Sequence, residues 1–178
     1  MGVLILHIVK FKSLIILIEL MKKKLELSLQ EKYAPHSICF GCGPANKKGF
    51  RIKSKVNGEN VELDFKPKKY HHVFEGYVSG GVLSVILDCH SNWSAAYYIM
   101  KKGGYDKLPA TVTAQYTVTF LKPTPLDTVL HLKTHAIEIH ENKAEVETLL
   151  EANGEITATA KGIFVAVRKG HPAYDRWG

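Results

Sequence analysis

The stretch that decides the fold is GYVSGGVLSVILD, residues 76–88, in which a double glycine opens a helical pattern. Apolar residues then recur at steps of three and four, the spacing of a helix that packs one face against a core. The pattern continues to about Lys102 and ends at Gly103-Gly104, because glycine commonly terminates helices. We predict a helix over 80–102. Its core-facing residues should be Val82, Val85, Ile86, Cys89, Trp93, Ala96, Tyr97 and Met100.

A second stripe of small and polar residues runs beside the apolar one. It contains an acid, Asp88, between Leu87 and Cys89. An acid among small side chains in mid-helix is not a plain solvent face. Two interpretations stay open: a functional carboxylate, or one that bonds a neighbouring loop. The stripe consists of Ser84, Asp88, Ser91, Asn92 and Ala95.

Period-two patterns on both sides of the helix predict strands. Two precede it, over 50–56 and 61–65, joined by the hairpin turn Asn57-Gly58. Residues 68–79 then form a loop. The four strands expected after the helix have short turns between them, so the sheet should be antiparallel. We predict an α+β fold, a long central helix wrapped by a roughly six-stranded sheet, with the later strands over 111–121, 128–139, 143–152 and 155–167.

Length and composition indicate one globular domain. The chain has 178 residues, 46% hydrophobic and 23% charged, which excludes disordered, collagen-like and polytopic membrane proteins. We divide it into an N-terminal extension and lead-in, 1–37, and a functional domain, 38–178. Lys10, Lys12 and Glu19 interrupt the apolar segment 1–20, so we expect no spanning helix or membrane contact there, with an amphipathic surface helix as the alternative. An odd number of cysteines, three, favours a reducing compartment and a cytoplasmic location.

The net charge of +7 is unevenly distributed. Residues 1–24 carry +4 of it, and the other 154 residues carry +3. This excess is too small to predict a nucleic-acid groove, and no stretch interleaves basic and aromatic residues. It suits a ligand with a few phosphates. Lys66, Lys68 and Lys69 are candidate phosphate contacts, or simply a solvated face.

His36-x2-Cys39-x2-Cys42 has the spacing of half a zinc site. No second pair of ligands follows it. Cys89 and His90 are candidate partners, but the helix pattern directs Cys89 toward the core. We therefore interpret Cys39 and Cys42 as small apolar residues in a tight turn, and predict neither a metal nor a cofactor.

The order and spacing of several segments resemble the hotdog-fold acyl-CoA thioesterases, in particular the phenylacetyl-CoA thioesterase-like branch. The likeness covers roughly 38–168. Besides the stretch quoted first, it rests on CFGCGPAN at 39–46, KGFRI at 48–52 and TFLKP at 119–123. The chain has no nucleophile elbow, phosphate loop or dinucleotide fingerprint, which argues against other common enzyme classes.

The resemblance implies hydrolysis of an acyl-CoA thioester to a free acid and coenzyme A. Gly80 and Gly81 match the oxyanion site, where helix N-terminal amides receive the developing charge. Asp88 matches the acid that acts as general base or nucleophile. Thr113 matches a hydroxyl residue that helps to hold the attacking water.

The resemblance further implies a homodimer or a dimer of dimers, with the acid supplied by the opposite subunit. We assign Ser79, His72 and Asn92 to substrate binding. Two positions depart from the family: Ser79 stands where histidine is common, and Val73 where an asparagine often occurs. The alternative function is a non-catalytic hotdog module that binds acyl-CoA or another hydrophobic ligand. A hydratase of the same fold is less favoured, because its Asp-His pairing is not evident.

Overall fold

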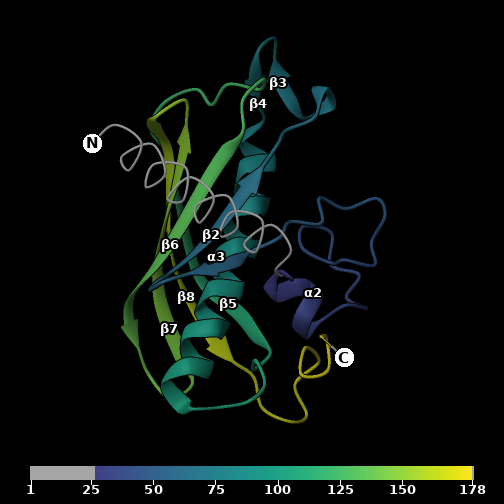
Figure 1. Ribbon diagram of the computed structural model, residues 1–178, viewed down its shortest axis with the longest axis vertical. Coiled ribbons are helices and arrows are strands. Elements are labelled where there is room, and N and C mark those ends of the chain that lie inside the picture. The colour runs from purple at the N-terminus through teal and green to yellow at the C-terminus, as the bar shows by residue number, and fades with distance from the viewer. Residues whose placement is uncertain (1–26, 178) are drawn as a thin grey trace, which may run out of the picture.

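The computed structural model describes residues 27–177, in which one long helix lies along one face of an antiparallel sheet (Figure 1). The predictions made for residues 1–20 fall outside this part of the chain. Within residues 27–177, no helix is both long enough and apolar enough to span a membrane. The predicted fold class, α+β with a central helix on six antiparallel strands, is confirmed.

The sheet has the strand order β1-β2-β6-β7-β8-β5, and every neighbouring pair is antiparallel. Asn153 and Gly154, with φ of 54° and 81°, form the tight turn between β7 and β8. Such a turn suits the twist of a hairpin and needs residues that tolerate positive φ. Strand β5 lies at one edge of the sheet. The bounds are β1 Lys55–Asn57, β2 Asn60–Phe65, β5 Thr111–Phe120, β6 Leu130–Ile139, β7 Lys143–Ala152 and β8 Glu155–Ala166.

Helix α3, Gly80–Gly103, contacts all four long strands. Buried hydroxyls join it to the sheet: Ser91 Oγ lies 2.7 Å from Thr148 Oγ1, and Tyr98 donates a 2.8 Å hydrogen bond to the Thr134 carbonyl. Gly104, with φ of 63°, adopts the left-handed conformation that ends the helix, as predicted.

The predicted core-facing stripe of α3 is only partly right. Four of the eight predicted residues are buried, but Val82, Val85, Cys89 and Tyr97 are only half-buried. Leu83 and Leu87, which were not part of the predicted stripe, are buried in the core. Every residue from 90 to 100 except Tyr97 is buried. The reason is that this half of the helix is covered on more than one side, so burial there does not follow a single face.

Besides the sheet, α3 is covered by segments at the two ends of the described region, residues 27–177. The short helix α2, Leu29–Tyr33, begins at a capping box made by Ser28 and lies within the lead-in assigned to residues 1–37. Gln30 bonds Ser54, whose Oγ lies 2.8 Å from His90 Nδ1. At the other end, Trp177 stacks on Trp93 with ring centroids 4.3 Å apart. The tail therefore packs back on the domain, as its aromatic composition predicts.

Two segments differ from the sequence prediction. The strand expected over 50–56 is reduced to β1, because Arg51 has a positive φ of 54° and the amides of Phe50 and Ile52 bond the carbonyls of residues 40 and 41. The expected loop 68–79 contains ordered structure: a 3-10 turn, η1 Lys69–His71, and a two-stranded ribbon, β3 His72–Phe74 with β4 Tyr77–Val78. The ribbon stands at the end of the molecule where α3 begins (Figure 1).

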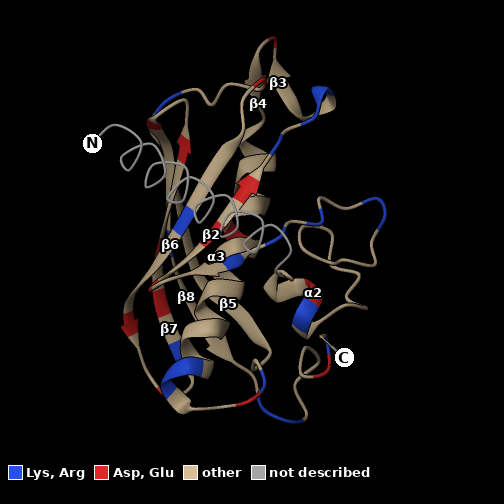
Figure 2. Cartoon of the chain, viewed as in Figure 1, with Lys and Arg blue, Asp and Glu red and all other residues tan. Residues whose placement is uncertain are grey.

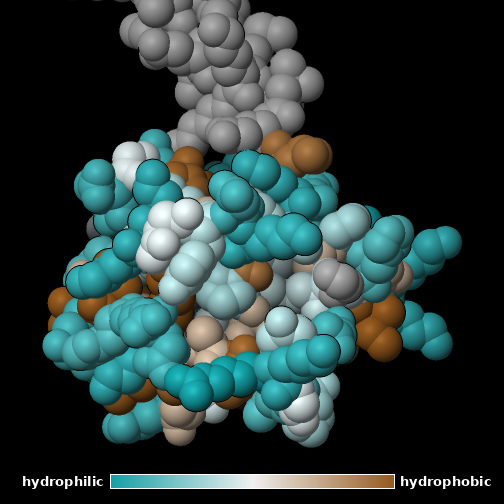
Figure 3. Space-filling model, turned by 90° about the horizontal axis from the view of Figure 1, so that it is seen from below, coloured by the Kyte–Doolittle hydropathy of each residue, from teal (hydrophilic) through white to brown (hydrophobic). Residues whose placement is uncertain are grey.

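The surface is mixed in character. The face seen from below in Figure 3 is largely hydrophilic, with small and separate hydrophobic patches. Larger exposed apolar side chains gather instead on the ribbon and the end of β5. They are Val73, Phe74, Tyr77, Phe120 and Leu121.

Candidate active site

Two residues singled out from the sequence, Asp88 and Thr113, meet in the structure. Thr113 Oγ1, on the edge strand β5, donates a 2.9 Å hydrogen bond to Asp88 Oδ1, near the middle of α3. A bulge in the pairing of β5 with β8 follows Thr113 at once. Because bulges re-aim side chains, the irregularity helps to direct this threonine toward the helix.

The surroundings of Asp88 favour its neutral form more than water would. Burial raises the pKa of its carboxyl group, while the Thr113 hydrogen bond and the Arg176 guanidinium lower it by less. A carboxylate with a raised pKa is a stronger base than one in water. No sequence pattern linked Arg176 to this site, because the residue lies 88 positions after Asp88 in the chain.

Asn92, one turn after Asp88, lies behind this pair. Thr111 Oγ1 donates a 2.8 Å hydrogen bond to Asn92 Oδ1, and Arg176 donates one of 3.3 Å to the same oxygen. Asn92 Nδ2 reaches Thr113 Oγ1 at 3.5 Å. The asparagine is 4% exposed, so its amide holds the strand, tail and helix together behind the carboxylate.

The first turn of α3 presents free amides. Ser79 precedes the helix, but its side chain makes no capping hydrogen bond, and its carbonyl accepts from Leu83 N. The N–H groups of Gly80 and Gly81 have no acceptor within the helix, since the first turn has none to offer. They coincide with the positive end of the helix dipole. A Cβ atom on Gly80 would lie 3.4 Å from the Phe120 ring, so the chain passes close to β5 here.

The two neighbouring histidines differ in their placement. His72, assigned to substrate binding, is exposed on β3 and pairs with Val78. His71 is buried, stacks on Phe65, and accepts a hydrogen bond from Ser79 N through its carbonyl. Burial lowers the pKa of His71, while its backbone carbonyl supports the start of the helix. Val73 is exposed on the same ribbon.

Two hollows flank the first turn of α3. One, of about 500 Å³, is bordered by Val82 and lined by cations. The other, of about 340 Å³, includes Gly80 and is mostly apolar. Basic residues lie on the loop between α2 and β1 and on the turn before β3 (Figure 2). Of the three lysines named from the sequence, Lys66 and Lys68 line the first hollow, together with Lys48, Arg51 and Lys53.

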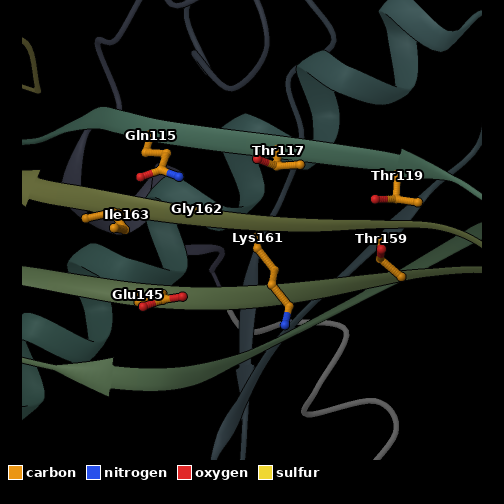
Figure 4. Close-up of a pocket in the computed structure, with 8 residues that line it drawn as sticks. All are labelled: Gln115, Thr117, Thr119, Glu145, Thr159, Lys161, Gly162 and Ile163. Carbon is orange, nitrogen blue, oxygen red and sulfur yellow. The ribbon is translucent and has the colours of Figure 1, made fainter.

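A third hollow, of about 290 Å³, lies on the opposite face of the sheet (Figure 4). Gln115 and Thr117 of β5 line it, while Tyr116 between them points to α3, where its hydroxyl bonds the Ser84 carbonyl. This face is polar and carries the pair Lys161–Glu147 at 3.3 Å. The sheet separates the hollow from α3, which carries Asp88.

The structure also brings Cys89 to the turn that carries Cys39 and Cys42. The three sulfur atoms lie within 4.8 Å of one another. The half-buried side chain of Cys89 therefore faces this loop rather than the centre of the core. His36, which shares the sequence spacing, is exposed and does not join the group.

Comparison with solved structures yields thioesterase-superfamily proteins. A thioesterase superfamily protein from Shewanella loihica PV-4 is 28% identical, with a TM-score of 0.57, over 70% of this chain and 98% of its own. A putative thioesterase related to phenylacetic acid degradation, from Ralstonia eutropha JMP134, is 18% identical over 71% and 92%, with a TM-score of 0.57. A hypothetical thioesterase from Streptococcus pneumoniae TIGR4, solved with coenzyme A, is 19% identical over 65% and 85%, with a TM-score of 0.54.

No protein-family model and no curated protein sequence matches the chain. The evidence of kinship is therefore structural, and it rests on the similarity of this helix-on-sheet fold to these proteins. On this evidence the chain has the hotdog fold of the thioesterase superfamily, to which the similar S. loihica protein belongs.

Proposed function

We propose that this protein hydrolyses an acyl-CoA thioester to a free acid and coenzyme A. The observation that carries the proposal is the half-buried Asp88 carboxylate, held by the Thr113 hydroxyl on a helix whose N-terminal amides are free. A poorly solvated carboxylate can act as a base or nucleophile, and such amides can stabilise an oxyanion.

In the proposed reaction Asp88 removes a proton from water while the water oxygen adds to the thioester carbonyl carbon. The carbonyl oxygen becomes an oxyanion, which accepts hydrogen bonds from the Gly80 and Gly81 amides. Collapse of the intermediate breaks the carbon–sulfur bond, and the coenzyme A thiolate takes up a proton as it leaves. Thr113 orients the carboxylate. Direct attack by Asp88, with an anhydride that water then hydrolyses, is the other form of the same chemistry.

The two hollows beside the helix N-terminus support an amphiphilic substrate. Coenzyme A carries phosphates, which suit the hollow lined by Lys48, Arg51 and Lys66. An acyl group suits the apolar hollow beside Gly80, lined by Leu83 and Phe120. The coenzyme A in the S. pneumoniae structure supports this choice of ligand. Membership of the phenylacetyl-CoA thioesterase-like branch and a cytoplasmic location are part of the same proposal.

We propose that a complete site needs two copies of the chain. Gly80 and Asp88 are eight residues apart in α3, which corresponds to about 12 Å along the helix axis. A base and an oxyanion donor that act on one carbonyl group must lie closer than that. Strand β5 offers a ten-residue edge beside Thr113, where a second copy could pair. The acid of one protomer would then serve the helix N-terminus of its partner.

The decisive experiment is a thiol-release assay over a series of acyl-CoA chain lengths, with Asp88→Asn beside the native protein. We expect at least about a 100-fold loss of kcat in the variant, since general bases contribute that much or more. Light scattering on the same samples counts the subunits. Full activity in Asp88→Asn would refute the assignment of this residue. Acyl-CoA binding by the native protein without thiol release would favour the non-catalytic module instead.

A further inference from the structure

The Cys39–Cys42 turn and helix α3 place three free thiols in one cluster. Cys39 Sγ lies 3.9 Å from Cys89 Sγ, and Cys42 Sγ completes a group in which all sulfur atoms are within 4.8 Å. The separation is almost twice the length of a disulfide bond, which is about 2.05 Å. It matches the spacing of about 3.8 Å between thiolates that share one tetrahedral zinc ion, for zinc–sulfur bonds of about 2.3 Å.

Two glycines hold this geometry. A Cβ atom on Gly41 would collide with Cys89 Sγ, and one on Gly43 would collide with the backbone of Ser37 and Cys39. The turn is closed by a 2.9 Å hydrogen bond from Gly43 N to the Cys39 carbonyl. Only glycine therefore allows the loop to approach α3 so closely, and that approach brings the three sulfurs together.

Several N–H groups lie around the sulfur atoms and could donate to metal-bound thiolates. The backbone amides of Gly41 and Cys42 lie close to the Cys39 sulfur. The indole Nε1 of Trp93 is buried near Cys42 and has no hydrogen-bond partner among residues 27–177. A metal-bound thiolate would give that donor an acceptor, and such hydrogen bonds are common around thiolate sites.

We propose that Cys39, Cys42 and Cys89 bind one Zn²⁺ ion through three thiolates, with water in the fourth position. Soft sulfur ligands select zinc among common divalent ions. Among residues 27–177, no His, Asp or Glu side chain joins the cluster, so the protein supplies three ligands. This inference replaces the expectation of no metal, which named Cys89 as a candidate ligand but set it aside because the helix pattern directed that residue toward the core.

The bound ion would tie the loop to α3. Gly41 and Phe40 lie in the turn, and their carbonyls bond the amides of Ile52 and Phe50, which line the cationic hollow. Metal binding would therefore brace one wall of that hollow. Hydrogen exchange of residues 38–52 should slow when Zn²⁺ binds, whether or not the protein hydrolyses thioesters.

The test uses the full chain, reduced, treated with a chelator and titrated with ZnCl₂ against a competing indicator. We expect one Zn²⁺ per chain, and protection of all three thiols from alkylation, read by mass spectrometry. Cys39→Ser and Cys89→Ser should each weaken binding by at least about 100-fold, more than the loss of a supporting group would. His36→Ala is the matched control and should bind as the native protein does.

A fourth variant tests the supporting donor. Trp93→Phe keeps a ring against Trp177 but removes the indole N–H group, and it should weaken Zn²⁺ binding by about 10-fold. Circular dichroism without metal establishes that each variant is folded. Substoichiometric zinc in the native protein, unprotected thiols, or native affinity in Cys39→Ser would each overturn the proposal.

Discussion

Thr113 Oγ1 donates a 2.9 Å hydrogen bond to Asp88 Oδ1, across the gap between the edge strand of the sheet and the middle of the central helix. The two residues are 25 positions apart in the chain. Asn92 and Arg176 support the contact from behind, so helix, strand and C-terminal tail all contribute to the position of one carboxylate.

This contact predicts the effect of removing the hydroxyl group. Thr113→Val keeps the volume of the side chain but loses a hydrogen bond to a charged group, which contributes about 1.5–3 kcal/mol. If that energy is used to orient Asp88, kcat should fall by roughly 10-fold or more in the thiol-release assay. Thr113→Ser, which retains the hydroxyl, should keep most of the rate. Equal rates for the two variants would show that the hydroxyl has no role in turnover.

The first helical residue offers a way to delete one amide donor. Gly80→Pro removes an N–H group at a position where helices accept proline, and Ser79, with ψ of 133°, already has the conformation required before proline. Loss of an oxyanion donor should lower kcat by about 100-fold. Gly80→Ala is the control, because its Cβ makes an ordinary contact with Phe120 and its amide is kept. A native rate in Gly80→Pro would leave Gly81 as the donor to test.

His71 should make stability depend on pH. Burial, and then the charge of Lys68, lower the pKa of His71, and its Nδ1 accepts a hydrogen bond from the Lys68 amide. The unfolded chain therefore binds a proton near pH 6.5 that the folded protein does not, so the free energy of unfolding should fall as pH drops below that value. The slope from this residue stays below about 1.4 kcal/mol per pH unit, the value for a whole proton.

The control for this dependence is His71→Phe, which keeps an aromatic ring against Phe65 but cannot titrate. Urea unfolding at pH 7.5, 6.0 and 5.0 compares the two proteins. The native protein should lose more stability than the variant between the first and last pH. Parallel curves would mean that other histidines cause the pH dependence.

The C-terminal tail should contribute to stability through Trp177. This side chain is 7% exposed and stacks on the fully buried Trp93. Trp177→Ala should lower the free energy of unfolding by about 2–4 kcal/mol, as large-to-small changes of buried residues do. Tyr174→Ala, in the same tail but 43% exposed, should change it by less than about 0.5 kcal/mol. Similar losses in both variants would contradict the role given to the stacked pair.

Sequence alone determined the elements whose signals are local. The double glycine, the apolar period and Gly103-Gly104 define α3, and Asn153-Gly154 defines a hairpin, because both depend on backbone conformations that few residues adopt. The same local signals predicted six antiparallel strands. They failed at residues 50–56, where the backbone bonds a loop instead of a strand, and no periodic pattern records that choice.

The site depended on the tertiary structure. Asp88 and Thr113 could be named from the sequence through a family resemblance, and Asn92 and Cys89 were candidates. The role of Arg176, the hydrogen bonds of Asn92 and the contact of Cys89 with Cys39 could not be predicted. Arg176 and Cys89 each contact a residue at least 50 positions away in the chain. Asn92 lies in the half of α3 where almost every residue is buried, so the periodic pattern does not show which way its side chain points. Local sequence fixes the period of a helix. Only packing decides which neighbours cover each side, and therefore which polar groups meet.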